Sequence, residues 1–248
     1  MFEIKLDSAE YWRDCLEAIV SLVEEGSFHI SKDGISLRAM DPSGISMVSF
    51  TIPSKSFSKF DVSDSVSIGL NLSNLSKIMQ RTRSNEALVM KDSDNKLSLE
   101  FISESGKRKY KIPLIDIRKN ADKEPTISFD VEAEVTSEPM KNMIKDAAQM
   151  SSYISFKAAK NQFVASAYGD SGELEGTYEE DGKVIKKISA QKNAQAVFNL
   201  EYLDNMVKGC PAGNEISLSL KSDDPLKLSY KIRDAQITYY LAPYMETT

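Results

Sequence analysis

The chain has 248 residues, of which 41% are hydrophobic and 27% are charged, and these values are typical of a globular protein with one large domain or two small ones. The apolar stretch 15–23 is too short for a membrane span, and the N-terminus lacks the basic and apolar regions of a secretory signal. The net charge of −6 is unusual for a protein that holds nucleic acid by affinity alone, so any role on DNA must depend on a local basic surface.

The sequence predicts no metal and no cofactor. Cys15 and Cys210 are too few for a disulfide framework, which indicates a reducing compartment such as the cytoplasm. Neither has a second Cys or a His nearby at zinc-ligand spacing. The acidic runs 24–25 and 179–181 could bind a metal, but charge runs of this kind are usually solvated surface.

In chain order, apolar residues at helical spacing first predict a helix over 8–24, with Ser8 as its N-cap. A second helix is predicted over 72–83, a third over 138–150, and a fourth over 200–208, which Gly209 and Pro211 end. The segments between them alternate apolar and polar residues, as strands do: 29–40, 45–52, 96–102, 107–114, 162–168, 183–190, 215–220, 226–232 and 235–242.

Two loop features complete this pattern. Asp-Gly pairs at 33–34 and 181–182 predict hairpin turns. The polar stretch 118–125 (RKNADKEP) predicts a linker. The fold class is therefore α+β, with antiparallel sheets dominant.

The chain repeats itself at an offset of 128–129 residues. Residues 71–90 and 199–220 both begin Asn-Leu and run through a short helix into Asn-Glu and an alternating strand. The same offset pairs Ser8 with Ser137, and Met40 with Gly169. Chance is the alternative, since helix–turn–strand patterns are common. Three matches at one offset favour two copies of one module.

The segment 168–181 (YGDSGELEGTYEED) raises the possibility of catalysis, because Gly-Asp-Ser-Gly resembles the nucleophile sequence of trypsin-like proteases. Ser171 could then act with His29 and Asp41 in a triad. The protease pattern continues with glycine, however, and here Glu173 follows. The glycine-rich loops that bind phosphates are also missing. We therefore expect no enzymatic activity and no catalytic residues, with a hydrolase as a remote alternative.

Residues 34–50 (GISLRAMDPSGISMVSF) and 237–246 (ITYYLAPYME) together resemble the proliferating cell nuclear antigen family of DNA sliding clamps. The resemblance implies a head-to-tail ring of three subunits around duplex DNA, bound without regard to sequence. Each subunit would have two similar domains, here 1–117 and 128–248, joined by a connector at 118–127. The implied partners are DNA polymerase, flap endonuclease, DNA ligase and an ATP-driven clamp loader, at the chromosome (in the nucleus if the source is eukaryotic). A subunit of a heterotrimeric or repair-specialised clamp is the alternative.

In such a ring the helices line the hole, so their basic residues would face DNA. The expected DNA-facing residues are Arg13, Lys77, Arg81, Lys141, Lys145 and Lys208. The first helix departs from the family, because its polar face carries Glu10, Asp14 and Glu17 where relatives usually carry lysines. Strong DNA contact by that helix is therefore not expected.

The resemblance also implies an apolar surface groove for a short partner motif with one glutamine and apolar and aromatic anchors. Methionines suit a groove that accepts many partners, because they repack easily. The expected lining residues are Met40, Ile45, Met47, Pro125, Ile127, Pro225, Tyr240, Ala242, Pro243 and Met245.

Two strand sequences have complementary faces, and the resemblance implies that they form the ring contact. In KRKYKI, Lys107, Lys109 and Lys111 share one face. In ELEGTYE, Glu173 and Glu175 share one face, and Leu174 and Tyr178 share the other. Ammonium groups would meet carboxylates if these strands paired, and Tyr110 would meet an apolar partner. The resemblance implies that the two strands are edges of different subunits, paired head to tail. The alternatives are that they pair within one chain or that each is a protected charged edge.

Overall fold

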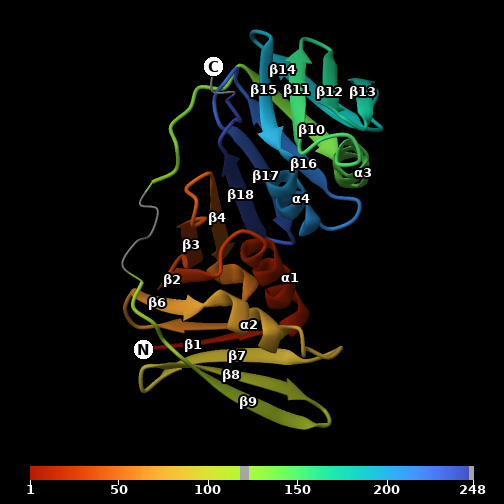
Figure 1. Cartoon of the computed structure of the whole chain (residues 1–248). Coiled ribbons are helices and arrows are strands. Elements are labelled where there is room, and N and C mark those ends of the chain that lie inside the picture. Colours follow the sequence, from red (N-terminus) through yellow and green to blue (C-terminus); the bar gives the residue numbers. More distant parts are fainter. Residues whose placement is uncertain (118–122, 246–248) are drawn as a thin grey trace. The chain divides into compact units, whose positions relative to one another are not determined.

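The computed structural model describes residues 1–117 and 123–245 and resolves into two compact units (Figure 1). The first consists of Met1–Pro42, Val48–Lys123 and Ile232–Ile237. The second consists of Ser43–Met47, Glu124–Lys231 and the chain from Thr238 onward. Most of the predicted linker, residues 118–122, lies outside the described residues, as does the end of the family motif at Glu246.

The first unit contains two helices and two antiparallel sheet segments. Its strands run in the orders β5-β1-β7-β8-β9 and β4-β3-β2-β6. The elements, in chain order, are β1 (Phe2–Leu6), α1 (Ala9–Val20), β2 (Glu25–Ser31), β3 (Gly34–Met40), β4 (Ser46–Pro53), β5 (Lys59–Val62), β6 (Val66–Asn71), α2 (Leu72–Met79), β7 (Ala87–Ser93), β8 (Lys96–Ser103) and β9 (Gly106–Pro113), with a 3-10 turn at Ser54–Ser56.

The second unit repeats the first, element for element. Its strand orders, β14-β10-β16-β17-β18 and β13-β12-β11-β15, match those of the first unit position by position, which confirms the predicted duplication. The elements are β10 (Val131–Thr136), α3 (Ser137–Ala147), β11 (Tyr153–Ala159), β12 (Gln162–Gly169), β13 (Gly172–Glu179), β14 (Ile185–Ala190), β15 (Ala194–Asn199), α4 (Leu200–Lys208), β16 (Glu215–Leu220), β17 (Leu226–Ile232) and β18 (Ala235–Leu241).

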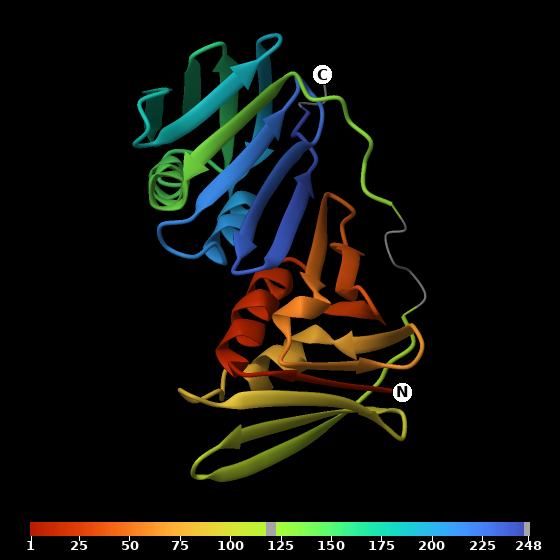
Figure 2. The ribbon, with the colours of Figure 1, turned by 180° about the vertical axis from the view of Figure 1, so that it is seen from behind.

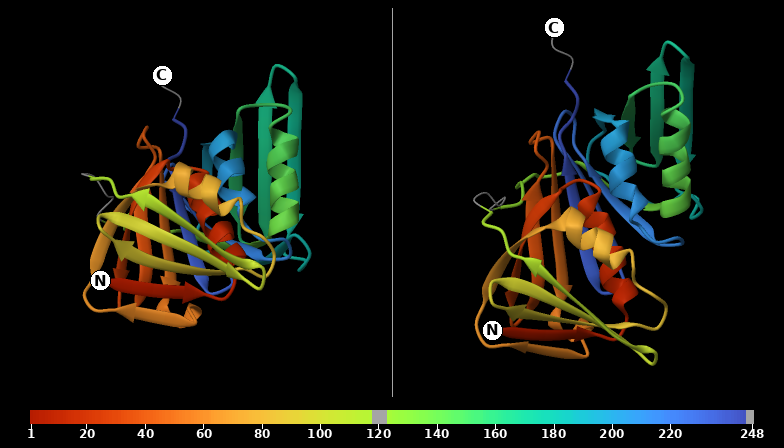
Figure 3. Two further views of the ribbon diagram at one scale, coloured as in Figure 1. Left: turned by 90° about the horizontal axis from the view of Figure 1, so that it is seen from below. Right: turned by 60° about the horizontal axis from the view of Figure 1, so that its bottom comes forward.

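In each unit the two helices lie side by side and pack on the strands (Figure 3). In the first unit the apolar stripe of α1 buries Trp12 against Phe28 and Phe50, with ring centroids 5.4 and 6.0 Å from that of Trp12. The second unit has its own aromatic cluster, in which Phe156 lies 5.2 Å from Phe163. Truncating a buried aromatic side chain of this kind costs about 3–5 kcal/mol. Within residues 1–117 and 123–245, every helix is too short or too polar to span a membrane.

Asparagine side chains begin the second helix of each unit. The side-chain oxygen of Asn71 accepts a hydrogen bond from the backbone N–H of Asn74 at 2.8 Å, and that of Asn199 accepts one from Glu201 at 2.9 Å. The repeated Asn-Leu pair is therefore a repeated helix cap. Ser8, the predicted cap of α1, makes no side-chain capping bond, and the cap position of α3 is Thr136, so Ser137 is its first residue.

Three helices end earlier than the sequence predicts. The hydroxyl of Ser21 donates to the carbonyl of Ala18 at 2.7 Å, and α1 ends at Val20 rather than at residue 24. After α2 and α3 the backbone tightens into turns with i→i+3 bonds, such as that from Arg81 N–H to the carbonyl of Ile78 at 3.0 Å. Arg81 therefore follows α2 instead of lying on it.

Of the two predicted hairpin turns, one is confirmed and one is wrong. Strands β2 and β3 form a hairpin that closes with Ser31 opposite Gly34, which has φ of 144°. The second Asp-Gly pair, at 181–182, joins β13 to β14, which belong to different sheets. The pair does form a turn, because the Asp181 carboxylate accepts a hydrogen bond from the N–H of Lys183 at 2.8 Å. This turn does not close a hairpin.

Candidate nucleic-acid and protein interfaces

On the α2 side of the first unit, two predicted basic residues are exposed. Leu72, Leu75 and Met79 are buried on one face of α2, while Lys77 is exposed on another. Arg81 is exposed in the turn that follows. Both side chains therefore present their charge to solvent.

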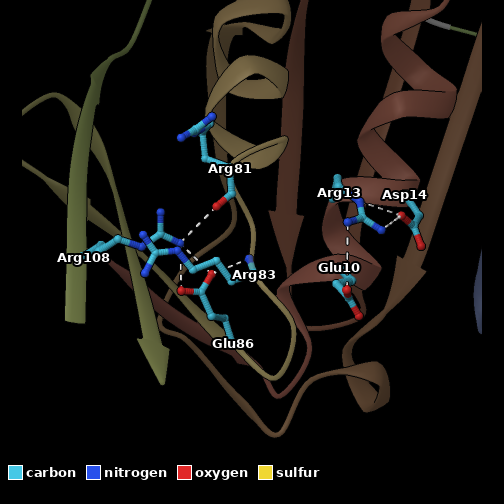
Figure 4. A network of polar contacts seen from close by, with 7 residues as sticks. All are labelled: Glu10, Arg13, Asp14, Arg81, Arg83, Glu86 and Arg108. Carbon is cyan, nitrogen blue, oxygen red and sulfur yellow. Dashed lines mark hydrogen bonds and ion pairs between the residues drawn. The ribbon is translucent and has the colours of Figure 1, made fainter. Parts of the chain in front are cut away.

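The charge of Arg13 on α1 is already matched. Its guanidinium donates through Nε and Nη2 to Oδ1 of Asp14, at 3.0 and 2.8 Å, and lies 4.0 Å from Glu10 (Figure 4). The neighbouring carboxylates raise the pKa of Arg13. The polar face of α1 is thus acidic overall, as its sequence indicated.

The predicted basic residues of the second unit divide in the same way. Lys145 on α3 and Lys208 at the end of α4 are exposed. Lys141 is half-buried, and its Nζ donates to the carbonyl of Cys210 at 2.6 Å. This bond places a positive charge at the C-terminal end of α4, where the helix dipole is negative. Lys141 therefore has a structural role, because a group of the protein already holds its charge.

A buried carboxylate that the sequence did not single out organises the turn after α2. The side chain of Glu86 is 2% exposed and accepts two hydrogen bonds from Nη2 of Arg108 on β9, at 2.6 and 2.8 Å (Figure 4). It also accepts the backbone N–H of Arg83 at 2.8 Å. In the sequence, this residue was marked only by the Asn-Glu pair that follows the second helix in both copies.

Part of the predicted groove is exposed, and part of it is core. Among the apolar residues the large exposed ones include Ile45 at 42% and Met245 at 62%, both in the second unit, and Met40 at 50% in the first unit. Met47 and Tyr240 are buried, at 4% and 5%, so their predicted place on the groove surface is wrong. The remaining predicted lining residues are half-buried or exposed: Pro125, Ile127, Pro225, Ala242 and Pro243.

Backbone contacts hold the C-terminal segment in place within the second unit. The N–H of Ala242 donates to the carbonyl of Ile45 at 2.9 Å, and the N–H of Tyr244 donates to the carbonyl of Val197 at 2.7 Å. The ring of Tyr244 stacks on Tyr153 with centroids 4.0 Å apart. Pro243 lacks an N–H, so it stands between two anchored residues without leaving a donor unpaired.

Strand β9 is the last strand of its sheet (Figures 1 and 2). Exposure alternates along it as predicted. Lys107, Lys109 and Lys111 are exposed, whereas Arg108 and Tyr110 are half-buried. Lys107 lies 3.7 Å from Glu100 on the neighbouring strand β8. The outer edge of β9 presents a row of backbone groups beside a basic face.

Strand β13 is likewise the last strand of its sheet, where it pairs with β12. Glu173 and Glu175 are exposed, and Leu174 and Tyr178 are half-buried on the other face. Burial raises the pKa of the Tyr178 hydroxyl. Within the described part of the chain, β9 has β8 and β13 has β12 as its one strand neighbour, so each strand leaves one edge unpaired.

The residues of the hydrolase alternative come from both units, Ser171 from the second and His29 and Asp41 from the first. Ser171 lies with Asp170 in the exposed two-residue loop between β12 and β13, which closes with Gly169 opposite Gly172. The ring Nδ1 of His29 lies 3.2 Å from the hydroxyl of Ser67, within the first unit. Burial also raises the pKa of the Cys210 thiol to about 11, the opposite of what a nucleophilic thiol needs.

Comparison with known proteins gives consistent similarities along the whole chain. Residues 1–124 match the family model "Proliferating cell nuclear antigen, N-terminal domain", and residues 123–245 match the corresponding C-terminal domain. The DNA polymerase sliding clamps of Pyrococcus furiosus and Thermococcus gammatolerans are each 32% identical, over 99% of both chains compared.

Solved structures show the same likeness. The clamp from Thermococcus kodakaraensis superposes with a TM-score of 0.93 at 25% identity, covering 98% of this chain and 100% of the other. The proliferating cell nuclear antigen of A. fulgidus, solved with the C-terminal region of FEN-1 bound, has a TM-score of 0.91 at 24% identity, with full coverage of both chains.

Proposed function

The chain belongs to the proliferating cell nuclear antigen family, and on that premise we propose that it is a DNA sliding clamp. In this role three copies form a closed ring around duplex DNA, and the ring tethers replication and repair enzymes to it. The clamp itself performs no catalysis. Its place of action is the chromosome.

The observation that carries the proposal is the pair of complementary free edges. Strand β9 ends one sheet with a lysine face, and β13 ends another with a glutamate face. Joining the β9 edge of one copy to the β13 edge of the next is a head-to-tail contact between two different patches, which closes into a ring when the rotation allows. Edge strands of this length invite pairing when they are left free.

The duplication supports the two-domain plan of such a ring. We propose an N-terminal domain of residues 1–117, a connector of residues 118–127 and a C-terminal domain of residues 128–248. Each domain would contribute its two helices to the lining of the hole, so that three subunits give six similar modules around the DNA.

The proposed DNA contacts are the exposed basic residues Lys77, Arg81, Lys145 and Lys208. Contacts to phosphate are independent of base sequence, and they weaken with salt. A ring that is linked to DNA by topology does not need tight binding, and a sparse basic lining lets it slide. We give Arg13 and Lys141 lesser roles, because protein groups already hold their charges.

The proposed partner groove consists of the exposed and half-buried apolar residues Met40, Ile45, Ala242, Pro243 and Met245, with Pro125, Ile127 and Pro225. FEN-1 bound to the A. fulgidus clamp supports a flap endonuclease as one partner. The relatives' description as DNA polymerase clamps supports a polymerase as another. DNA ligase and a clamp loader complete the proposed set.

The DNA-facing assignment is tested by replacing Lys77, Arg81, Lys145 and Lys208 together with alanine. We expect normal trimers that load on circular DNA poorly or dissociate sooner. Because each lost phosphate contact removes about 0.9 from the slope of log affinity against log salt, the salt dependence should also become shallower. Retention is measured as the fraction of clamp left on circular DNA across a salt series.

The matched control replaces Lys32, Lys55, Lys160 and Lys192, which are exposed and lie outside the four helices. This variant has the same net charge as the first and should be retained like the native chain. Equal retention of both variants at every salt concentration would count against the assignment.

A further inference from the structure

Tyr168 on β12 is a large exposed side chain that no part of the proposed function uses. It is 55% exposed. Among the described residues, the other large apolar side chains that are exposed to a similar degree are Met1 and the residues of the proposed groove and its C-terminal segment, Met40, Ile45, Tyr244 and Met245. Exposure alone assigns no role to a single aromatic side chain. The strand beside Tyr168 does indicate one.

The register of β12 and β13 places Tyr168 directly opposite Glu173 (Figure 1). Residues that lie opposite each other in an antiparallel pair project from the same face of the sheet, so the ring shares the face of the glutamates. The pair Ser166 and Glu175 continues this face along the two strands. An exposed aromatic ring therefore lies one strand away from the free edge, at the start of β13.

The lysine face of β9 complements this arrangement. Both edge strands pair antiparallel with their neighbours, and the same kind of pairing would bring the start of β13 to the end of β9 in another copy. The lysine nearest that end is Lys111, which is exposed. Strands in a sheet lie about 4.8 Å apart, so a tyrosine and a lysine on either side of Glu173 can touch through their long side chains. Ring, carboxylate and ammonium would then form one contact.

The duplication gives an independent reason for this placement. Met40 on β3 and Tyr168 on β12 both lie six residues after the first residue of their strand, and both are exposed. In the loop that follows Met40, the carbonyl of Ile45 accepts the N–H of Ala242 just after β18. Strands β18 and β9 hold the same place in the two units, so the loop that follows Tyr168 is expected at the end of a β9 strand. The proposed ring supplies that strand from the next copy.

We propose that Tyr168 is a contact residue between copies of this chain, where its ring packs on the stem of Lys111 in the next copy. The inference rests on the proposed clamp function, and it adds to the ring contact an aromatic anchor that lies outside the two edge strands. Tyrosine is enriched among the residues that dominate binding at interfaces, because its rigid ring buries a large area at a low cost in conformational entropy.

Tyr168→Ala tests this role, with the concentration at which trimers dissociate as the readout. Loss of the ring should weaken each contact between copies roughly fivefold. Because three such contacts hold the ring, the midpoint concentration of dissociation should rise about tenfold. Mass photometry over a dilution series measures the trimer fraction. If native trimers persist at the lowest concentration, faster exchange of subunits between two labelled preparations measures the same weakening.

Two variants of β12 serve as controls. Tyr168→Phe keeps the ring, and its trimers should dissociate like those of the native chain. Ser166→Ala changes the same face of the same strand, opposite Glu175, and should also dissociate like the native chain. Equal weakening by Ser166→Ala and Tyr168→Ala would show a general effect on the sheet and would overturn the contact.

A double-mutant cycle identifies the partner residue. In a Lys111→Ala background the proposed partner is gone, so Tyr168→Ala should weaken each contact by less than about twofold. In a Lys107→Ala background, which removes a lysine of the same face at the other end of β9, Tyr168→Ala should keep its effect of about fivefold. The same effect in both backgrounds would overturn the pairing of Tyr168 with Lys111.

The outcomes separate this inference from the function on which it rests. If the native chain forms trimers and those of Tyr168→Ala are equally stable, the role of Tyr168 is overturned and the clamp function stands. If the native chain stays single at every concentration, the proposed ring fails and the role of Tyr168 fails with it.

Discussion

A basic side chain is available to DNA only when no group of the protein already holds its charge. On α3, Lys141 and Lys145 are one helical turn apart and carry the same charge. Lys141 is committed to the carbonyl of Cys210, whereas Lys145 is exposed. The same distinction separates Arg13, which is bound to Asp14, from Lys77. DNA contact on this account comes from a subset of the basic residues.

The groove makes a prediction at the scale of single side chains. A peptide with one glutamine and apolar and aromatic anchors on a single helical turn should bind, and Met40→Ala, Ile45→Ala and Pro243→Ala should each weaken it. Anchoring contacts of this kind cost more than about 1 kcal/mol when truncated, or roughly fivefold in affinity. Fluorescence polarisation with a labelled peptide measures the effect.

The control for the groove is Tyr168→Ala, which removes an aromatic side chain that is 55% exposed on β12, outside the proposed groove. Its affinity for the peptide should equal that of the native chain. The proposed groove would be contradicted if the peptide did not bind, or if the Ile45→Ala and Pro243→Ala variants bound it as tightly as the native chain does.

At the scale of elements, the two free edge strands decide the assembly. Lys109→Glu with Lys111→Glu places acidic residues on β9, which would then meet the acidic face of β13 in the next subunit. Each cross-strand pair is worth about 0.2–1 kcal/mol, and like charges reverse its sign. Sedimentation should therefore show single chains of 27.7 kDa at concentrations where the native protein forms trimers.

Adding Glu173→Lys and Glu175→Lys to the same chain exchanges the two charged faces and should restore trimers at least in part. This rescue distinguishes a specific contact from general destabilisation. Trimers of the doubly substituted Lys109 and Lys111 variant, with the same stability as native trimers, would show that the interface lies elsewhere.

Elements whose identity depends on local pattern could be predicted from the sequence. The alternation in KRKYKI and ELEGTYE is visible residue by residue, and both segments are edge strands with the expected faces. Duplication was visible too, because Asn71 and Asn199 recur as caps. The fold class followed from these local signals.

What the sequence could not show depends on partners distant in the chain. Lys141 and Cys210 are 69 residues apart, and Glu86 and Arg108 are 22 apart. Met47 alternates like a surface residue in a strand, yet it is 4% exposed, because neighbouring elements cover it. Periodicity gives the face on which a side chain lies, whereas burial and pairing are set by tertiary packing.

For the whole molecule, the net charge of −6 is compatible with a role on DNA. Tight binding to a polyanion requires a strongly basic surface. A closed ring requires only that the lining of its hole not repel the duplex. An acidic chain with a few exposed basic residues on helices would avoid binding DNA side-on and would still slide once it is closed around it. Topological linkage, and not tight binding, would then keep the protein on DNA.

The most direct test of this topology is to load the clamp onto nicked circular DNA and then cut the circle once with a restriction enzyme. The proposed ring should stay on the uncut circle at moderate salt and should leave within minutes of linearisation, by sliding off the ends. Blocking both ends with a bound protein should restore retention. Equal rates of loss from circular, linear and end-blocked DNA would contradict the central claim that the chain forms a ring around the duplex.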